Sequence, residues 1–85
     1  MTYTVEFAPR TRRELRKLFF VARKRILDKI DSLADNPFPH NYTEMKGSQN
    51  YYRVKVGNYR IIYTIEHGKL LILAISIEPR CEIYR

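Results

Sequence analysis

The chain has 85 residues, of which 45% are hydrophobic and 29% are charged, and its formal net charge is +7. This length allows a single domain, residues 1–85, with one thin core, and it excludes a deep substrate cavity between two domains. Any catalysis must therefore take place on an open surface and act on a large substrate. The excess of Lys and Arg indicates a polyanionic partner, with nucleic acid ahead of an anionic membrane or an acidic protein.

The sequence also indicates where the protein works. Its longest uninterrupted apolar run, residues 70–75, is far shorter than the ~18 residues of a membrane-spanning helix. The N-terminus lacks the basic-then-apolar pattern of a secretory signal, and the single Cys81 excludes an internal disulfide. We therefore expect a cytoplasmic protein that does not enter a membrane.

The first half of the chain predicts a strand and then helical structure. Apolar and polar residues alternate over residues 3–7, as in a short strand. Thr11 and Glu14 have the spacing of a helix-capping box. The pattern up to residue 34 fits either one helix or two helices with a break at residues 19–22, because no Gly or Pro marks a break. Either way, one apolar stripe runs along the helical face: Leu15, Leu18, Phe19, Ala22, Ile26, Ile30 and Leu33.

The second half predicts a loop and a three-stranded antiparallel meander. Pro37, Pro39 and Gly47 mark residues 35–50 as a loop. Strands are expected over residues 51–56, 59–66 and 69–77, joined by two-residue turns at Gly57-Asn58 and His67-Gly68. The whole order predicts an α+β fold in which the helices pack on one face of a single sheet.

The first turn determines which side chains share a sheet face. It places Lys55 opposite Arg60, so Arg53, Lys55 and Arg60 project from one face, which we call the cation face. Like charges directly opposite each other destabilise a sheet. Two interpretations stay open: a solvated face that happens to be basic, or a site that binds phosphate. The opposite face is expected to meet the helices through Val54, Val56, Tyr59, Ile61 and Tyr63.

The second turn extends this register into the third strand. It predicts that Ile62 pairs with Leu73 and Arg60 with Ile75. The third strand is then apolar on both sides, and its row on the cation face must be covered by the chain itself or by a partner. That row is Leu71, Leu73 and Ile75, whereas the row facing the helices is Leu70, Ile72 and Ala74.

The helical segment is the other basic region. Residues 10–29 hold most of the Lys and Arg of the chain, opposed only by Glu14 and Asp28. This segment is either a solvated helix face, a surface that binds the phosphate backbone, or a surface for an acidic protein.

The run YYRVKVGNYRIIY, residues 51–63, resembles the central signature of the RelE/ParE superfamily of toxin–antitoxin toxins. The apolar strand at residues 70–77, with Pro79-Arg80 and Glu82-Ile83-Tyr84 after it, resembles the end of the RelE branch. The similarity of layout covers almost the whole chain. ParE-type toxins share the hairpin but act on DNA gyrase.

Resemblance to RelE implies a ribosome-dependent endoribonuclease, an mRNA interferase that cuts messenger RNA in the ribosomal A site and inhibits translation. It also implies a cognate antitoxin, and a toxin–antitoxin hetero-oligomer that binds operator DNA. The catalytic positions of the family match Arg53, Lys55, Arg60 and Arg80, and its tail aromatic residue matches Tyr84. One departure is that the position matched by Arg53 is Lys in some members, and Arg cannot act as a base.

These residues predict a division of roles. RNA supplies its own nucleophile, the 2′-hydroxyl, so the protein must mainly stabilise the charge that develops on phosphorus. Arg60 and Arg80 are expected to hold the non-bridging oxygens. Lys55, which can lose a proton, is the candidate general base, assisted by Arg53. Tyr84 stacks on a base, transfers a proton, or packs the end of the sheet. Further phosphate contacts are expected from Arg53, Arg10, Arg13, Arg16, Lys17 and Lys46.

No metal and no other cofactor is expected, because no group of His, Cys and carboxylate residues has metal-ligand spacing. Two other functions stay open. One is a ParE-like inhibitor of DNA gyrase, and the other is a non-enzymatic basic partner in a DNA-binding repressor complex.

Overall fold

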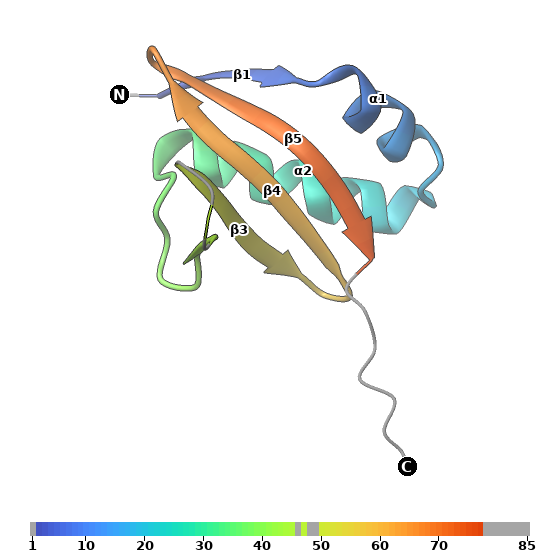
Figure 1. The fold of residues 1–85 in the computed structure, drawn as a ribbon. Helices are drawn as coiled ribbons and strands as arrows, with labels where there is room; N and C mark the ends of the chain where they lie inside the picture. The colour runs from blue at the N-terminus through green and yellow to red at the C-terminus, as the bar shows by residue number, and fades with distance from the viewer. Residues whose placement is uncertain (1, 46, 48–49, 78–85) are drawn as a thin grey trace.

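The computed structural model describes residues 2–45, 47 and 50–77, and it places two helices against one five-stranded sheet (Figure 1). The strand order is β1-β5-β4-β3-β2, with β1 parallel to β5 and the other neighbours antiparallel. The predicted α+β fold is confirmed, and the expected loop contains a short strand, β2, that was not predicted. The elements are β1 (Thr4–Phe7), α1 (Pro9–Arg16), α2 (Phe20–Asp35), β2 (Thr43–Glu44), β3 (Tyr51–Val56), β4 (Tyr59–Glu66) and β5 (Lys69–Ile77).

The helical region is two helices, and the break lies at residues 17–19, slightly earlier than predicted. The guanidinium of Arg23 donates to the carbonyl oxygens of Leu15 at 3.1 Å and Leu18 at 2.8 Å. A cation that satisfies carbonyl groups at the end of α1 and just after it makes a break possible without Gly or Pro. Phe19 is 89% exposed, so its predicted place on the apolar stripe is wrong. It is the extended residue just before α2, where the helical periodicity is interrupted.

The first turn of α1 is not the predicted capping box. The helix begins at Pro9, and no side chain caps it. The hydroxyl of buried Thr11 instead donates to the carbonyl oxygen of Ala8 at 2.6 Å, and the Ala8 N–H donates to the carbonyl oxygen of Ile72 in β5 at 2.9 Å. The start of α1 is thus tied to the sheet rather than capped by its own side chains.

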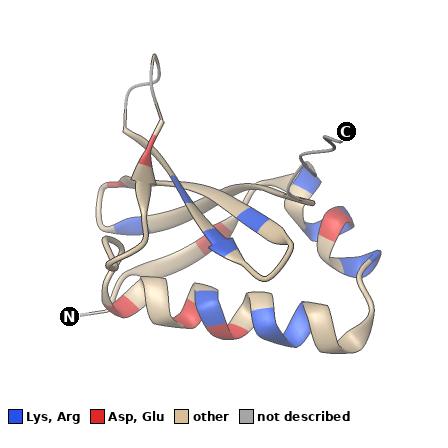
Figure 2. Cartoon of the chain, turned by 90° about the horizontal axis from the view of Figure 1, so that it is seen from below, with Lys and Arg blue, Asp and Glu red and all other residues tan. Residues whose placement is uncertain are grey.

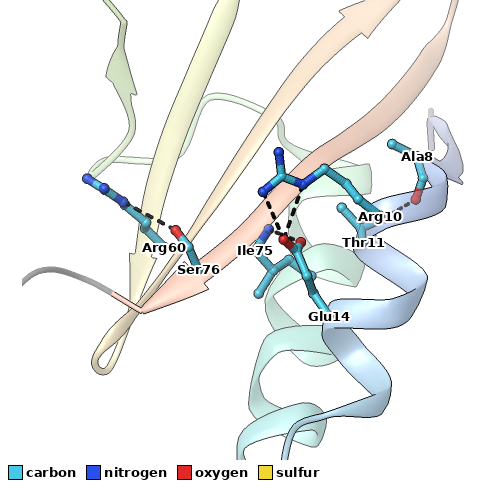
Figure 3. A network of polar contacts seen from close by, with 7 residues as sticks. All are labelled: Ala8, Arg10, Thr11, Glu14, Arg60, Ile75 and Ser76. Carbon is cyan, nitrogen blue, oxygen red and sulfur yellow. Dashed lines mark hydrogen bonds and ion pairs between the residues drawn. The ribbon is translucent and has the colours of Figure 1, made fainter.

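Glu14 completes this link between α1 and the sheet (Figure 3). Because β1 pairs only with Lys69–Ile72, the outer edge of β5 beyond Ile72 has no neighbouring strand among the described residues. One Glu14 carboxylate oxygen accepts the backbone N–H of Ile75 at 2.8 Å, and the other accepts two hydrogen bonds from Arg10 at 3.1 and 3.2 Å. The carboxylate therefore takes the place of a missing strand at this edge.

The core lies between α2 and the sheet face that carries the apolar strand residues. The predicted helix-facing rows of β3 and β4 are confirmed, because Val54, Ile61 and Tyr63 are buried. From α1, Leu15 packs against the same cluster, as does Leu18 just after the helix. The buried apolar residues are Ile26, Ile30, Leu33, Ala34, Val54, Ile61, Tyr63, Leu70, Ile72 and Ile75.

A β-bulge shifts the pairing of β4 with β5. Leu73 has no partner residue on β4, so the strand gains one residue and its alternation reverses from that point. The predicted pairs Ile62–Leu73 and Arg60–Ile75 are therefore wrong. Ile75 turns to the core, where it is 4% exposed, and Ala74 turns to the cation face. The observed pairs around the bulge are Tyr63 with Ile72, Ile62 with Ala74, Ile61 with Ile75 and Arg60 with Ser76.

The apolar row on the cation face is consequently shorter than predicted. Leu71 and Leu73 remain there, half-buried, at an open hollow of about 510 Å³ that Tyr51, Thr64 and Glu66 also line.

Aromatic rings hold the segment before β3 against the sheet. Phe38 lies 5.3 Å from Tyr42 and 5.1 Å from Tyr52 between ring centroids, and Tyr52 lies 5.7 Å from Tyr63. The hydroxyl of buried Tyr63 donates to the carbonyl oxygen of Pro37 at 2.5 Å. Burial, together with the neighbouring phenols of Tyr42 and Tyr52, raises the pKa of Tyr63 above its usual value.

We expect Glu14→Ala to lower the free energy of unfolding by about 1.5–3 kcal/mol, because it leaves the Ile75 N–H unpaired at the sheet edge. Arg10→Ala removes only the exposed ion pair and should cost less than about 1 kcal/mol. Urea unfolding of the two purified variants measures both values. Equal losses would contradict the role of Glu14 as a substitute strand.

Ile75→Ala should cost about 2–5 kcal/mol of stability, the usual loss for truncating a fully buried Ile. Leu73→Ala, at the bulge, should cost clearly less because its side chain is only half-buried. Chemical denaturation of both variants tests the register. If the two variants lost similar, small amounts of stability, both side chains would lie on the cation face, as the continuous register predicts, and the bulge would not exist.

Tyr63→Phe should cost about 1–3 kcal/mol near neutral pH, since it leaves the Pro37 carbonyl unpaired. A raised pKa means that the native state binds the phenolic proton more tightly than the unfolded chain does. The resulting stabilisation is present below the unfolded pKa of about 10 and is lost as the pH rises above it. Above pH ~10 the wild type should therefore lose stability more steeply than Tyr63→Phe, by up to ~1.4 kcal/mol per pH unit. Unfolding curves recorded from pH ~8 to ~11 measure this difference, and parallel slopes would refute it.

Candidate active site

The β3–β4 hairpin brings three cations onto one face, as predicted. Lys55 pairs directly with Arg60, and Arg53 pairs with Ile62. Residues directly opposite each other project from the same side, and the intervening Val54 is buried on the other side. Lys55 is exposed, whereas Arg53 and Arg60 are half-buried. The hairpin therefore holds cationic groups side by side on the sheet face that is turned away from the helical core.

The tight turn produces this register. Gly57 has a φ of 59°, in the left-handed region that favours glycine, and the next residue is Asn58. Such a two-residue turn joins Val56 directly to Tyr59 across the ladder. Any longer connection would change which side chains face each other, so the juxtaposition of Lys55 and Arg60 depends on this turn.

The bulge in β5 adds a residue that the sequence analysis missed. With the shifted register, Ser76 lies opposite Arg60, and its Oγ accepts a hydrogen bond from Arg60 Nε at 3.5 Å (Figure 3). A continuous register would place the apolar Ile75 there instead. The available signal was that Ser76 is the only polar residue between Lys69 and Ile77. At 3.5 Å the contact is long, so it orients the guanidinium rather than binding it firmly.

The short strand β2 borders the site on its other side. Thr43 pairs with Arg53 and Glu44 with Tyr52. These pairs limit the cation face at β3, and they leave residues 54–56 of β3 without a neighbouring strand among the described residues on that edge.

The predicted helix cations are not brought to the hairpin. α1 packs against β5 and β1, whereas Arg53 and Lys55 lie on β3, on the other side of β4. Arg10 is held by Glu14. The remaining predicted phosphate contacts in and just after α1, which are Arg13, Arg16 and Lys17, form a separate basic surface (Figure 2).

Three predicted site residues, Lys46, Arg80 and Tyr84, lie outside the residues that the structure describes. Their assignments remain predictions.

Within residues 2–45, 47 and 50–77, no three His, Cys, Asp or Glu side chains gather in a way that could hold a metal ion. The same part of the chain contains no helix long and apolar enough to cross a bilayer. What the hairpin face offers is fixed positive charge, which suits the stabilisation of an oxyanion.

Comparison with known proteins finds relatives that are named RelE and that align with nearly the whole chain. The putative toxin RelE1 of Methanocaldococcus jannaschii is 28% identical over 88 residues, an alignment that covers 100% of this chain and 98% of that protein. The mRNA interferase toxin RelE of Escherichia coli is 26% identical over 88 residues, covering 99% of this chain and 92% of the relative. The crystal structure of the archaeal RelE–RelB complex from Pyrococcus horikoshii superposes with a TM-score of 0.83 at 26% identity, covering 95% of this chain and 100% of that one.

A family described as the ParE toxin of the type II toxin–antitoxin system, parDE, matches residues 5–84, which is nearly the whole chain. Together with the RelE relatives and the shared fold, this match shows that the chain belongs to this family, within the RelE/ParE toxin superfamily.

Proposed function

We propose that the protein is the toxin of a type II toxin–antitoxin system and acts as a ribosome-dependent endoribonuclease on mRNA in the A site. The observation that carries this proposal is the opposed pair of Lys55 and Arg60 on the cation face. A relative that covers nearly the whole chain, the E. coli protein, is named an mRNA interferase. An open, basic sheet face also suits a large polyanionic substrate better than a small molecule.

The proposed reaction uses the RNA's own 2′-hydroxyl. Its oxygen attacks the adjacent phosphorus, the bond from phosphorus to the 5′-oxygen breaks, and a 2′,3′-cyclic phosphate and a 5′-hydroxyl remain. The attacking oxygen gives its proton to Nζ of Lys55, which acts as the general base. The leaving oxygen takes a proton from the solvent or from the Tyr84 hydroxyl. The role of Tyr84 stays a prediction from the sequence.

The arginines stabilise the transition state. Arg60, oriented by Ser76, lies where it can donate to a non-bridging oxygen of the phosphate that Lys55 contacts. Arg53, on the same strand as Lys55, supplies a second fixed positive charge. Charge stabilisation of this kind is often the largest single contribution to catalysis, and it requires no metal. Arg80 is proposed to add a further guanidinium.

A cognate antitoxin is the proposed protein partner. The Pyrococcus horikoshii structure is a RelE–RelB complex, and a net charge of +7 favours an acidic partner. Half-buried Leu71 and Leu73 on the cation face offer apolar contacts beside the cations. An antitoxin that covers this face would block access of RNA, and the resulting hetero-oligomer is proposed to bind operator DNA.

A second candidate function is inhibition of DNA gyrase. The observation that favours it is the match of the ParE family to residues 5–84. In that case the hairpin would bind a protein, and its cations would perform no chemistry. Pulse induction in bacteria separates the two functions, because a gyrase inhibitor blocks DNA replication while translation continues.

We expect induction of the wild type to stop translation and to produce mRNA cuts at codons held in the ribosome, detected by primer extension. Lys55→Ala combined with Arg60→Ala should reduce cutting by roughly 10³-fold or more, since loss of a general base costs on the order of 10²–10⁴ and loss of an oxyanion contact on the order of 10²–10³. Lys69→Ala is the control, because Lys69 is an exposed cation at the other turn and pairs with Glu6 at 3.1 Å. It should cut like the wild type.

Circular dichroism should show that the double variant still folds. Full toxicity of that folded variant would reject the catalytic assignment, and a block of replication with intact translation would support the gyrase function. A wild-type chain that proves harmless without its antitoxin would point to a non-enzymatic partner in a repressor complex.

A further inference from the structure

A second basic site lies next to the hairpin, on α2. An open hollow of about 440 Å³ separates this helix from the end of β3, and Lys55 borders it together with the turn at Gly57. The helix contributes Arg25, Asp28 and Lys29 to its lining. The edge of β3 is accessible here because β2 pairs only with Tyr52 and Arg53. Figure 2 shows α2, with its Lys and Arg positions in blue, beneath the strands that carry the hairpin cations.

Two of these cations have no carboxylate partner within the described part of the chain. Neither Arg25 nor Lys29 forms an ion pair there, whereas Asp28 lies 3.6 Å from the ammonium of Lys24. Arg25 and Lys29 are four residues apart, and like charges at that spacing destabilise a helix by a few tenths of a kcal/mol. Proteins tolerate such locally destabilising features mainly at functional sites, so this pair of like charges points to a binding function.

Gly57 allows the guanidinium group of Arg25 to come close to the hairpin turn. A Cβ atom built at Gly57 would lie 3.3 Å from Nη2 of Arg25, so the group rests over the turn where a side chain would otherwise stand. Gly57 therefore serves two purposes: its positive φ makes the turn, and its missing side chain leaves room for Arg25 beside Lys55.

The lining of the hollow indicates which anion it would take. Apart from Val56 it consists of three cations, the hydroxyl-bearing Ser32, the glycine and the carboxylate of Asp28, which is paired with Lys24. An acidic protein segment usually needs an apolar anchor at the centre of its interface, and this hollow offers little for one. A phosphate backbone needs only cations and hydrogen-bond donors. The composition therefore favours nucleic acid over protein.

We propose that Arg25 and Lys29 form a second phosphate subsite, which binds the RNA backbone one or a few nucleotides from the scissile phosphodiester. Lys55 borders both sites, so a strand that lies on the cation face can continue around the end of the hairpin to α2. This inference rests on the proposed function for the identity of the strand. The subsite contributes affinity and alignment, and it takes no part in the chemical step.

The test measures binding apart from cleavage. A short single-stranded RNA with 2′-O-methyl groups cannot be cut, and its affinity for the purified chain is measured by fluorescence anisotropy from ~50 to ~200 mM salt. Arg25→Gln and Lys29→Gln should each weaken binding by roughly 3-fold or more at low salt. Each should also lower the slope of log affinity against log salt by about 0.7, the value for one lost phosphate contact on a single strand.

Lys69→Gln removes the same charge at a distant turn and is the matched control, expected to keep the wild-type salt slope. In ribosome-dependent cleavage the two α2 variants should lower kcat/KM and leave kcat nearly unchanged.

The outcomes separate the subsite from the nuclease proposal. If both α2 variants bind RNA like Lys69→Gln, the subsite is wrong. If they lose RNA binding while the wild type fails to cut mRNA, the subsite stands and the nuclease proposal falls. A polyglutamate peptide is the second probe, and loss of peptide binding with unchanged RNA binding would assign the hollow to an acidic protein and overturn the proposal.

Discussion

Side chains alternate along the β3–β4 hairpin, and the turn at Gly57 fixes which of them face the core and which face the opposite side. The same register buries Val54 and Ile61 and places Lys55 and Arg60 on the opposite face. A slip of one residue would exchange the two faces, so neither feature can change without the other. Burying each apolar side chain contributes about 1.5–3 kcal/mol, whereas an opposed pair of like charges costs at most about 1 kcal/mol. The core therefore holds the cations together against their mutual repulsion.

The bulge at Leu73 affects both the core and the candidate site. It sends Ile75 into the core and brings Ser76 to Arg60, so the same irregularity that completes the packing also supplies a polar neighbour for the site. The backbone of Ile75 is in turn held by Glu14 from α1. Helix α1 carries none of the hairpin cations. Through Glu14 it nevertheless stabilises β5, the strand whose Ser76 orients Arg60. Bulges are often found beside functional sites for this reason.

Most of the basic residues that the structure describes lie on three surfaces with different surroundings. Those on the hairpin are arranged by the sheet register, Arg25 and Lys29 of α2 face the hairpin turn, and those on α1 lie across the sheet. The proposed function rests on the residues of the site rather than on the fold, since one fold can host many functions.

Much of this architecture can be derived from the sequence by itself. Turn chemistry and two-residue alternation were sufficient to predict the hairpin, the Lys55–Arg60 pair and most of the core, because these features depend on residues close together in the chain. The exposure of Phe19, the Arg23 cap, the bulge at Leu73 and the approach of Arg25 to Gly57 could not be predicted in this way. Each of them arises where separate segments of the chain compete for the same space or the same hydrogen-bonding group, and only the packed structure decides which one prevails.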